Sequence, residues 1–302
     1  MSVNVAYSEA ATAEANGIHI VYDTFGDPTA PPILLIMGLG GQMIAWDEAF
    51  CTQLAGEGFW VIRFDNRDAG FSTSFDDAGV PDPMVVMQSA ALGRPVNAPY
   101  LLRDMADDAA GLLDALSIKS AHIVGVSMGG MIAQTMAIHH PHRVRTLASI
   151  MSHTGERDLP PPTPEALMLL ATPAPDGREA YIDYVVRAAH VIGSPGFPFD
   201  EARIRERAAR AYDRARNPAG EARQLAAIMA SGGRKEALQA LTIPTLVVHG
   251  KADTLVPVAG GIATAEAIPG ARLMLIDGMG HDLPPAVWDQ VIGAIATLAR
   301  EH

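Results

Sequence analysis

Short apolar runs that alternate with longer helical patterns limit this chain to one broad class of fold. The runs cover residues 33–37, 60–64, 122–126, 144–150, 245–249 and 272–276, and most are followed by Gly or Asp. Near-continuous hydrophobicity over so few residues is typical of strands that are buried on both faces, as in a parallel sheet. The alternation predicts an α/β fold in which helices flank a mostly parallel central sheet.

Two segments depart from this alternation in the first half of the chain. Residues 18–22 form a more amphipathic run, which we expect to be an early strand near an antiparallel edge of the sheet. Residues 76–100 are rich in Pro, Met and Ala, and we interpret them as an irregular insertion. Loops of this length inside compact domains are usually functional or disordered.

The alternation also stops in the second half of the chain. No strand-like run occurs in residues 152–241, which contain the proline cluster Pro160–Pro164 near their start. Residues 200–216 instead place apolar side chains at helical spacing. We expect residues 1–151 and 242–302 to form one α/β core domain, and 152–241 to be a helical cap, or lid, subdomain inserted between strands over the active site.

One face of the predicted 200–216 helix is rich in arginine. The arginines are Arg203, Arg205, Arg207, Arg210, Arg214 and Arg216, and they are interleaved with Glu201, Glu206 and Asp213. Oppositely charged side chains three or four residues apart stabilise a helix modestly as ion pairs. We therefore interpret this face as solvated and salt-bridged, in preference to an anion-binding patch.

The composition is that of an acidic protein with one or two domains. The 302 residues include 22 Lys and Arg against 34 Asp and Glu, a net charge of −12, and 49% are hydrophobic. A chain of this length can bury a sizeable core without disulfides or metals. Because nucleic acids and anionic membranes attract positively charged surfaces, the net charge argues against both as main partners.

The single cysteine, Cys51, excludes an intramolecular disulfide, as expected in a reducing compartment. It lies in a stretch with helical apolar spacing, and we expect it to be a buried core residue. Residues 1–17 lack the apolar core of a signal peptide, and no run approaches the roughly 20 apolar residues of a membrane span. These features predict a cytoplasmic protein.

The strongest indication of chemistry is Gly-Val-Ser-Met-Gly-Gly at residues 125–130, between a predicted buried strand and a helical pattern. A serine hydroxyl becomes an effective nucleophile only when it is exposed and an adjacent base removes its proton. A sharp strand-to-helix turn exposes Ser127, and the glycines two positions before and after it let the backbone fold tightly. The same turn directs the first amides of the helix toward the reacting oxygen.

A base and an acid follow Ser127 after later predicted strands. Asp253 comes after the fifth apolar run and His281 after the last one. Because the carboxyl ends of parallel strands share one edge, the three side chains are expected to meet there. The order predicts a triad in which Ser127 is the nucleophile, His281 the base and Asp253 the acid that orients the imidazole. Such a triad needs no cofactor, and no metal-binding spacing such as Cys-x-x-Cys occurs.

A reacting carbonyl also needs donors for the negative charge that develops on its oxygen. The backbone amide of Met128, next after the nucleophile, is one predicted donor of this oxyanion hole. The second is expected from the Gly-rich turn at residues 37–42, with Leu39 as the best candidate. Gly38 and Gly40 beside Leu39 let the backbone approach closely.

These motifs together resemble an α/β-hydrolase-fold serine esterase over nearly the whole chain. Residues 65–72 resemble the Asp-x-Arg-Gly-x-Gly-x-Ser segment of that superfamily, with Asp68 where Gly is usual. That departure, together with Met37 in place of His before Gly38 and the tail at residues 278–284, resembles the anthracycline (aclacinomycin) methylesterase branch. Residues 76–100 look like an insertion relative to that branch.

The resemblance implies the same roles that the motifs suggest. The resemblance to the methylesterase branch implies that Ser127, Asp253 and His281 of this sequence form a catalytic triad. It also implies that the amides of Leu39 and Met128 form the oxyanion hole. The predicted function is a serine carboxylic-ester hydrolase, a carboxylesterase that acts through an acyl-enzyme on hydrophobic small-molecule esters, methyl esters among them. The cap sequence does not match that branch residue by residue, so polyketide specificity does not carry over.

Substrate preference and reaction class stay open. Candidate pocket residues are Trp46, Met151, Met168 and Met229, and an apolar, adaptable pocket of this kind suits hydrophobic esters. The elbow sequence also resembles those of enol-lactonases and of enzymes that hydrolyse carbon–carbon bonds, so both remain alternatives. A third alternative is a ligand receptor that binds a small molecule without turning it over. The sequence carries no signal of oligomeric state.

Overall fold

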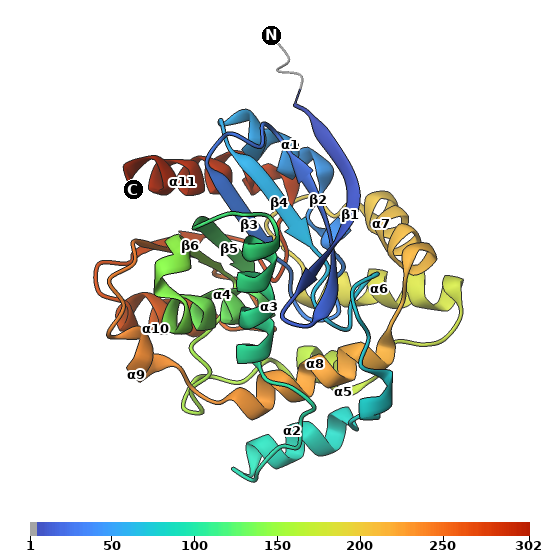
Figure 1. Ribbon diagram of the computed structural model, residues 1–302. Coiled ribbons are helices and arrows are strands. Elements are labelled where there is room, and N and C mark those ends of the chain that lie inside the picture. The colour runs from blue at the N-terminus through green and yellow to red at the C-terminus, as the bar shows by residue number, and fades with distance from the viewer. Residues whose placement is uncertain (1–4) are drawn as a thin grey trace.

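The computed structural model describes residues 5–302 and contains an eight-stranded sheet with helices on both faces (Figure 1). The strands are β1 (Tyr7–Ala15), β2 (Ile18–Phe25), β3 (Pro32–Ile36), β4 (Trp60–Phe64), β5 (Ala121–Val126), β6 (Val144–Ile150), β7 (Thr245–Gly250) and β8 (Arg272–Ile276). Their order is β1-β2-β4-β3-β5-β6-β7-β8, with β1–β2 and β2–β4 antiparallel and the other pairs parallel. The predicted α/β fold with a mostly parallel sheet is confirmed.

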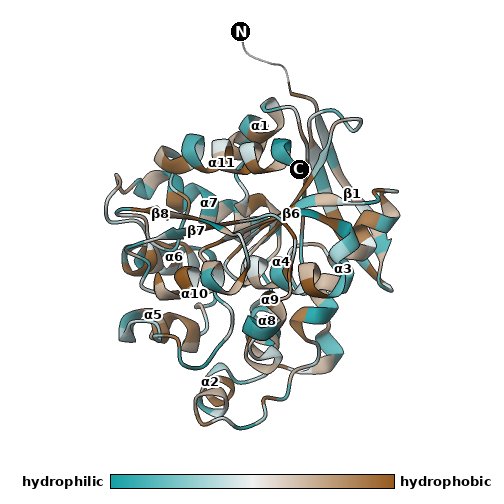
Figure 2. Cartoon of the chain, turned by 90° about the vertical axis from the view of Figure 1, so that its left-hand side faces the viewer, coloured by the Kyte–Doolittle hydropathy of each residue, from teal (hydrophilic) through white to brown (hydrophobic). Residues whose placement is uncertain are grey.

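The helices fall into two layers and a peripheral group. The layer helices are α1 (Glu48–Gly56), α3 (Leu102–Ala115), α4 (Met128–His139), α10 (Ala259–Ala267) and α11 (Trp288–Glu301). The peripheral helices are α2 (Pro83–Ala91), α5 (Pro164–Ala171), α6 (Arg178–Ile192), α7 (Glu201–Arg214), α8 (Pro218–Ser231) and α9 (Lys235–Leu238). Figure 2 shows α1 and α11 on one side of the sheet, with α3, α4 and α10 on the other.

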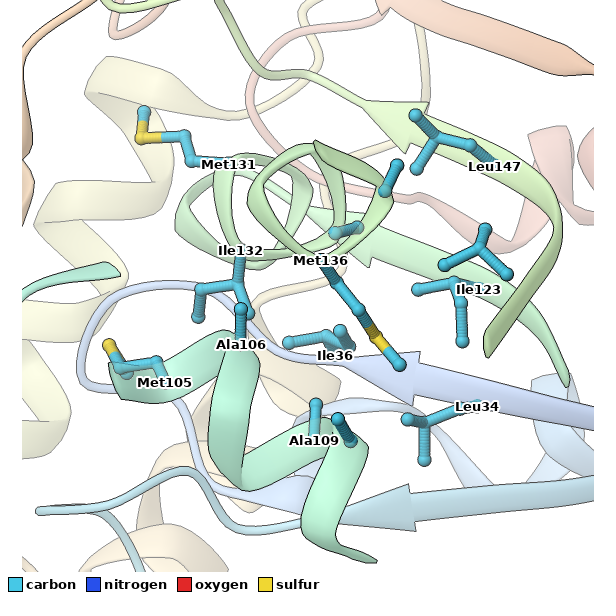
Figure 3. Close-up of a cluster of buried hydrophobic side chains, with 14 of the residues drawn as sticks. Leu34, Ile36, Met105, Ala106, Ala109, Ile123, Met131, Ile132, Met136 and Leu147 are labelled. Carbon is cyan, nitrogen blue, oxygen red and sulfur yellow. The ribbon is translucent and has the colours of Figure 1, made fainter. Parts of the chain in front are cut away.

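Strand β3 shows how alternation along a strand builds both layers. Leu34 and Ile36 face α3 and α4, whereas Ile33 and Leu35 face α1 and α11, and all four side chains are fully buried. Figure 3 shows Met136 of α4 beside Leu34 and Ile36. Burying one such side chain contributes about 1.5–3 kcal/mol. The near-continuous apolar runs therefore reflect a sheet that helices cover on both faces.

The six predicted apolar runs are all strands, but the edges of the sheet differ from the expectation. β8 is an edge strand in which Leu273 is 40% exposed, so the prediction of burial on both faces is wrong there. The 18–22 run belongs to β2, an antiparallel strand next to the edge, as predicted. The edge itself is β1, whose mostly exposed side chains include no apolar stripe that would have indicated a strand.

The 76–100 segment is more regular than its composition suggested. It contains α2, which begins where the Asp82 carboxylate accepts hydrogen bonds from the amides of Met84 and Val85. Pro83 occupies the first helical position, where its missing N–H costs nothing. α2 packs against α8, below the sheet in Figure 2. The interpretation of this stretch as irregular is therefore wrong for residues 83–91.

The arginine-rich helix is α7, and the prediction of a salt-bridged face is confirmed for Arg203, Arg205, Arg210 and Arg214, although the prediction that the face is solvated is wrong at Arg214. Several partners lie outside the helix, on segments that belong to the sheet and its layers: Arg203 pairs with Asp47 at 2.5 Å, Arg210 with Glu48, and Arg214 with Asp65 at 2.6 Å. The Arg214 side chain is only 13% exposed and Asp65 is fully buried, so this pair is not solvated. The arginines fasten α7 to the rest of the molecule.

Cys51 is fully buried on α1, as predicted for a core residue. Burial raises the pKa of its thiol to about 12. The thiol is therefore protonated and unreactive near neutral pH. Within residues 5–302, every helix is too short or too polar to cross a membrane.

Acid should destabilise the protein through His122 on β5. Burial lowers the pKa of His122 to about 4, and the positive charges of Arg145 and His302 act in the same direction. In the unfolded chain His122 is protonated below about pH 6.5, whereas in the folded protein it stays neutral down to about pH 4. The free energy of unfolding therefore falls by up to about 3 kcal/mol as the pH drops from about 6.5 to 4. Urea unfolding at a series of pH values measures this loss.

The matched variants are His122→Gln, which can still bond to Thr146, and His142→Gln at an exposed site. We expect a flatter pH dependence only for His122→Gln. The same slope in His122→Gln and wild type would contradict the assignment.

Candidate active site

Ser127 lies on the turn that joins β5 to α4. Its φ of 54° falls in the left-handed region, which a residue with a side chain adopts only under constraint. A Cβ on Gly125 would overlap the Gly129 carbonyl, and one on Gly129 would overlap the Ile36 carbonyl, so only glycine fits at either position. The sequence thus produces a strained turn that presents the hydroxyl at the carboxyl edge of the sheet.

His281 and Asp253 reach Ser127 from the loops after β8 and β7. The Nε2 atom of His281 lies 2.9 Å from the Ser127 Oγ, and its Nδ1 lies 2.7 Å from the Asp253 Oδ2. A carboxylate on Nδ1 requires the proton there, which leaves Nε2 to accept from the serine hydroxyl. The structure therefore brings the three predicted triad side chains together in the predicted order.

Asp253 is held as a carboxylate. Burial raises its pKa, but the charge of His281 and hydrogen bonds from His249 and His281 outweigh it and hold the pKa at about 2. Its Oδ1 also accepts the amides of Leu255 and Val256, at 2.9 and 2.8 Å. An ionised, fixed acceptor keeps the imidazole in one tautomer across the neutral pH range.

The predicted oxyanion turn lies directly against the nucleophile. A Cβ built on Gly38 would stand 3.2 Å from the Ser127 Cβ and 3.7 Å from its Oγ, and the next residue, Leu39, lines the same cavity as Ser127. A hydrogen bond of 3.1 Å from the Gly41 amide to the Gly38 carbonyl closes the turn. Within the described chain, the amides of Leu39 and Met128 donate to no other residue. Both amides are therefore available to a ligand.

Helix α8 holds this turn in place, through a residue that sequence reasoning missed. The Gly40 amide donates to the Gln224 Oε1 at 2.8 Å, and the Gln224 Nε2 donates to the Arg67 carbonyl at 2.7 Å. Gln224 is fully buried, and both ends of its amide are satisfied. No sequence pattern links it to Gly40, which is 184 residues away.

The His281 loop is also tied to the inserted helices. The His281 amide donates to the Ile192 carbonyl at the end of α6, at 2.6 Å. The Gly280 amide donates to the Ser194 Oγ at 2.9 Å, and Ser194 in turn bonds to Asp282. The segment between β6 and β7 therefore touches both the base and the oxyanion turn.

Two cavities meet at Ser127 and Leu39. The larger, of about 350 Å³, is lined by Trp46 and Met151, and the smaller, of about 230 Å³, by Met229. These three predicted pocket residues therefore lie at the site. Met168 lines neither cavity and is 57% exposed on α5, so its prediction is wrong. The next residues on that helix, Leu169 and Leu170, line the larger cavity instead, because the helix turns them inward.

Four carboxylate or guanidinium side chains of the larger cavity were not expected from the sequence. They are Asp47 before α1, Arg207 of α7, Glu221 of α8 and Asp282 beside His281. Burial lowers the pKa of Arg207, and the nearby charge of Asp47 partly offsets this shift. Burial raises the pKa of Asp282, partly offset by its hydrogen bond with Ser194. Burial also raises the pKa of Glu221, partly offset by the charge of Arg216. Each was missed because its position follows from how the inserted helices fold back over the sheet.

Asp68, the residue that replaces the usual Gly, lies behind this site in a buried network. It has φ of 65°, and its carboxylate receives two hydrogen bonds from Arg223 of α8, at 2.7 and 2.9 Å. The Tyr100 hydroxyl donates to it at 2.6 Å. The neighbouring Arg67 pairs with Asp108. These contacts make Arg67 and Asp68 structural and join the inserted helix to the sheet.

The sequence profile of the alpha/beta hydrolase fold matches residues 31–284. The chain belongs to this family. Residues 5–302 of this α/β hydrolase contain no group of three or more His, Cys, Asp or Glu side chains arranged to hold a metal ion. The family expected from the elbow motif is confirmed.

Individual relatives of this α/β hydrolase have different activities. It is 30% identical to rhodomycin D methylesterase from Streptomyces sp. strain C5, over 91% of this chain and 93% of that one. It is 26% identical to 3-oxoadipate enol-lactonase 2 from Acinetobacter baylyi, over 88% of each. The solved meta-cleavage product hydrolase from Pseudomonas fluorescens IP01 superposes with a TM-score of 0.73 at 22% identity, covering 96% and 97%. The resemblance to the methylesterase branch is confirmed.

Proposed function

We propose that this α/β hydrolase is a serine carboxylesterase that cleaves hydrophobic small-molecule esters, methyl esters among them, through an acyl-enzyme. The observation that carries the proposal is the continuous hydrogen-bonded chain from Ser127 through His281 to Asp253, which opens onto a largely apolar cavity. A serine with its base in place and two free amides beside it suits acyl transfer. The methylesterase relatives support an ester as the substrate.

The proposed mechanism follows from the positions of these groups. His281 takes the proton as the Ser127 Oγ attacks the ester carbonyl, and the Leu39 and Met128 amides bind the oxyanion. His281 then protonates the leaving alcohol, and Asp253 stabilises the imidazolium that forms in between. A water molecule, activated by the same histidine, hydrolyses the acyl-enzyme. The chemistry needs no metal or organic cofactor.

We also propose that residues 152–241 act as a cap on a core formed by 1–151 and 242–302. Two contacts support this division: α6 bonds to the His281 loop, and α8 bonds to the turn at residues 37–42. The lone buried Cys51 suits a cytoplasmic location, where thiols stay reduced. The proposed partner is a small-molecule hydrophobic ester, in preference to a nucleic acid or a membrane.

A second candidate is an enol-lactonase or a carbon–carbon bond hydrolase. The enol-lactonase and meta-cleavage product hydrolase relatives favour it. A panel of substrates distinguishes the two candidate functions. It contains nitrophenyl esters graded by acyl length, methyl esters of bulky acids, and an enol-lactone. A clear optimum among the esters supports the esterase, and uniformly low ester rates beside rapid lactone opening support the alternative. Binding without turnover of any compound would indicate a receptor.

The hydrogen bond from Gly40 to Gln224 should matter for rate more than for binding. In Gln224→Leu the Gly40 amide loses its acceptor, and the Leu39 amide next to it loses its fixed direction. We expect kcat to fall about ten- to a hundredfold with little change in KM, since oxyanion donors act on the transition state. Steady-state kinetics on the best ester measures this, and a thermal melt shows that the variant is folded. A rise in KM at unchanged kcat would contradict a role in positioning the turn.

A further inference from the structure

A carboxylate without a counterion faces the cavity that contains Ser127. Glu221 lies in the first turn of α8, and its carboxyl carbon lies 3.1 Å from where a Cβ on Gly40 would be. Within residues 5–302, its carboxylate forms no hydrogen bond or ion pair. The nearest cation acting on it, Arg216, is engaged with Asp176 at 3.0 Å and with the Ala174 carbonyl at 2.6 Å.

The helix itself does not explain this placement. The N-terminus of α8 is already capped, because the Asn217 side chain accepts the Gly220 amide at 2.8 Å. Glu221 accepts none of the amides of its own helix, although an acid near a helix start is favoured by the dipole. That favourable interaction would persist if the side chain pointed to solvent. The Glu221 side chain is instead accessible where it lines the cavity, so its carboxylate is open to water or to a ligand and is paired with no protein group in the part of the chain that the structure describes.

The other charges of the cavity do not neutralise Glu221. Arg207 donates to the Ala45 carbonyl at 2.8 Å, and the acidic groups acting on it are Asp47 and Asp282. The ring of Tyr184 lines the same cavity and lies close enough to Glu221 to feel its charge. This cavity therefore combines a negative charge with an aromatic side chain, and both kinds of group attract alkylammonium ions.

We propose that Glu221 binds an ammonium group on the substrate, so that the preferred esters carry a positive charge beside an otherwise apolar body. The ester part of this statement rests on the proposed function. A bound cation would replace the missing counterion and would lower the pKa of the carboxyl group again. Recognition at this point determines specificity without participating in bond cleavage.

Paired substrates of equal shape test the proposal. For the acyl side, para-nitrophenyl aminohexanoate, with its ammonium at the chain end, is compared with para-nitrophenyl heptanoate. For the alcohol side, aminoethyl hexanoate is compared with propyl hexanoate. In at least one pair we expect wild type to favour the ammonium ester in kcat/KM by about tenfold or more. Equal rates, or a preference for the neutral ester in both pairs, would overturn the proposal.

Two variants separate recognition from general effects of charge. Glu221→Gln keeps the shape and should abolish the preference, so that the ratio of kcat/KM between the ammonium ester and its neutral partner falls to about one. Glu236→Gln on α9 changes the net charge equally at an exposed site outside the cavity and should retain the preference. A preference that survives in Glu221→Gln, or disappears equally in Glu236→Gln, would assign it to another group or to the overall charge.

Binding to an inactive variant distinguishes a failure of this proposal from a failure of the proposed function. Calorimetry with Ser127→Ala should show tighter binding of the ammonium ester than of its neutral partner, and Ser127→Ala/Glu221→Gln should bind both equally. If wild type cleaves no ester in the panel but this difference holds, the esterase proposal fails and the cation site stands. If esters are cleaved but the two ligands bind Ser127→Ala equally, the cation site fails alone.

Discussion

Ser127→Ala should lower kcat on the best ester by about four orders of magnitude or more, because it removes the nucleophile and leaves only the oxyanion hole and binding. KM or ligand affinity should change little, since the cavity is unaltered. The measurement is steady-state hydrolysis combined with labelling by a fluorophosphonate, which should modify wild type at Ser127 and leave the variant unlabelled.

The control is Ser89→Ala on α2, a serine that lines neither cavity at the triad. It should retain wild-type rates and labelling. His281→Ala should be nearly as inactive as Ser127→Ala, and the double variant no worse than either, because triad members act as a unit. Substantial ester hydrolysis by Ser127→Ala would rule out the serine mechanism.

Arg223→Met should destabilise the protein by about 3–5 kcal/mol, because it leaves a buried carboxylate without its counterion. This is the largest effect on stability that we expect from substituting one buried residue. Both Arg223 and Asp68 are fully buried, so the change removes the counterion and leaves the Asp68 carboxylate with uncharged donors, namely the hydroxyls of Tyr100 and Ser74 and the Phe75 amide. Urea unfolding at neutral pH gives the difference in free energy.

Two comparisons make this prediction specific to the buried pair. Arg205→Met removes a solvent-exposed ion pair with Asp183 and should leave the urea midpoint nearly unchanged. Adding Asp68→Gly to Arg223→Met removes the stranded charge and places glycine at a left-handed position, so it should recover about half of the loss or more. A double variant less stable than Arg223→Met would show that the stranded charge is not the cause.

The sequence was sufficient for the sheet and the triad because both depend on local rules. A buried strand on both faces must be apolar throughout, and a nucleophile turn must have glycine where a Cβ would overlap backbone, as at Gly125 and Gly129. Parallel strands then place Asp253 and His281 at the same edge as Ser127. The edge strand β1 was not predicted, because its exposed side chains form no apolar pattern that would indicate a strand.

The cavity was predictable only in part, because it is lined from segments that meet through the inserted helices. Trp46 and Met151 follow predicted strands or turns, so their neighbourhood is fixed by the sheet. Met168 was misplaced because the phase of a short helix decides which of its residues faces inward, and Leu169 and Leu170 do so. Glu221 carries no motif, and its role depends on a tertiary contact with Gly40.

The two anchor points of the inserted helices limit how this enzyme can be re-engineered. The bond from Gly40 to Gln224 and the bond from the His281 amide to Ile192 both join residues 152–241 to the reacting groups. A chimera that takes this segment from a relative would acquire a new substrate cavity but would also replace the supports of its oxyanion turn and its base. Grafts should therefore keep the end of α6, Arg214 of α7 and the Arg223–Gln224 part of α8, and exchange cavity-lining residues elsewhere in the segment.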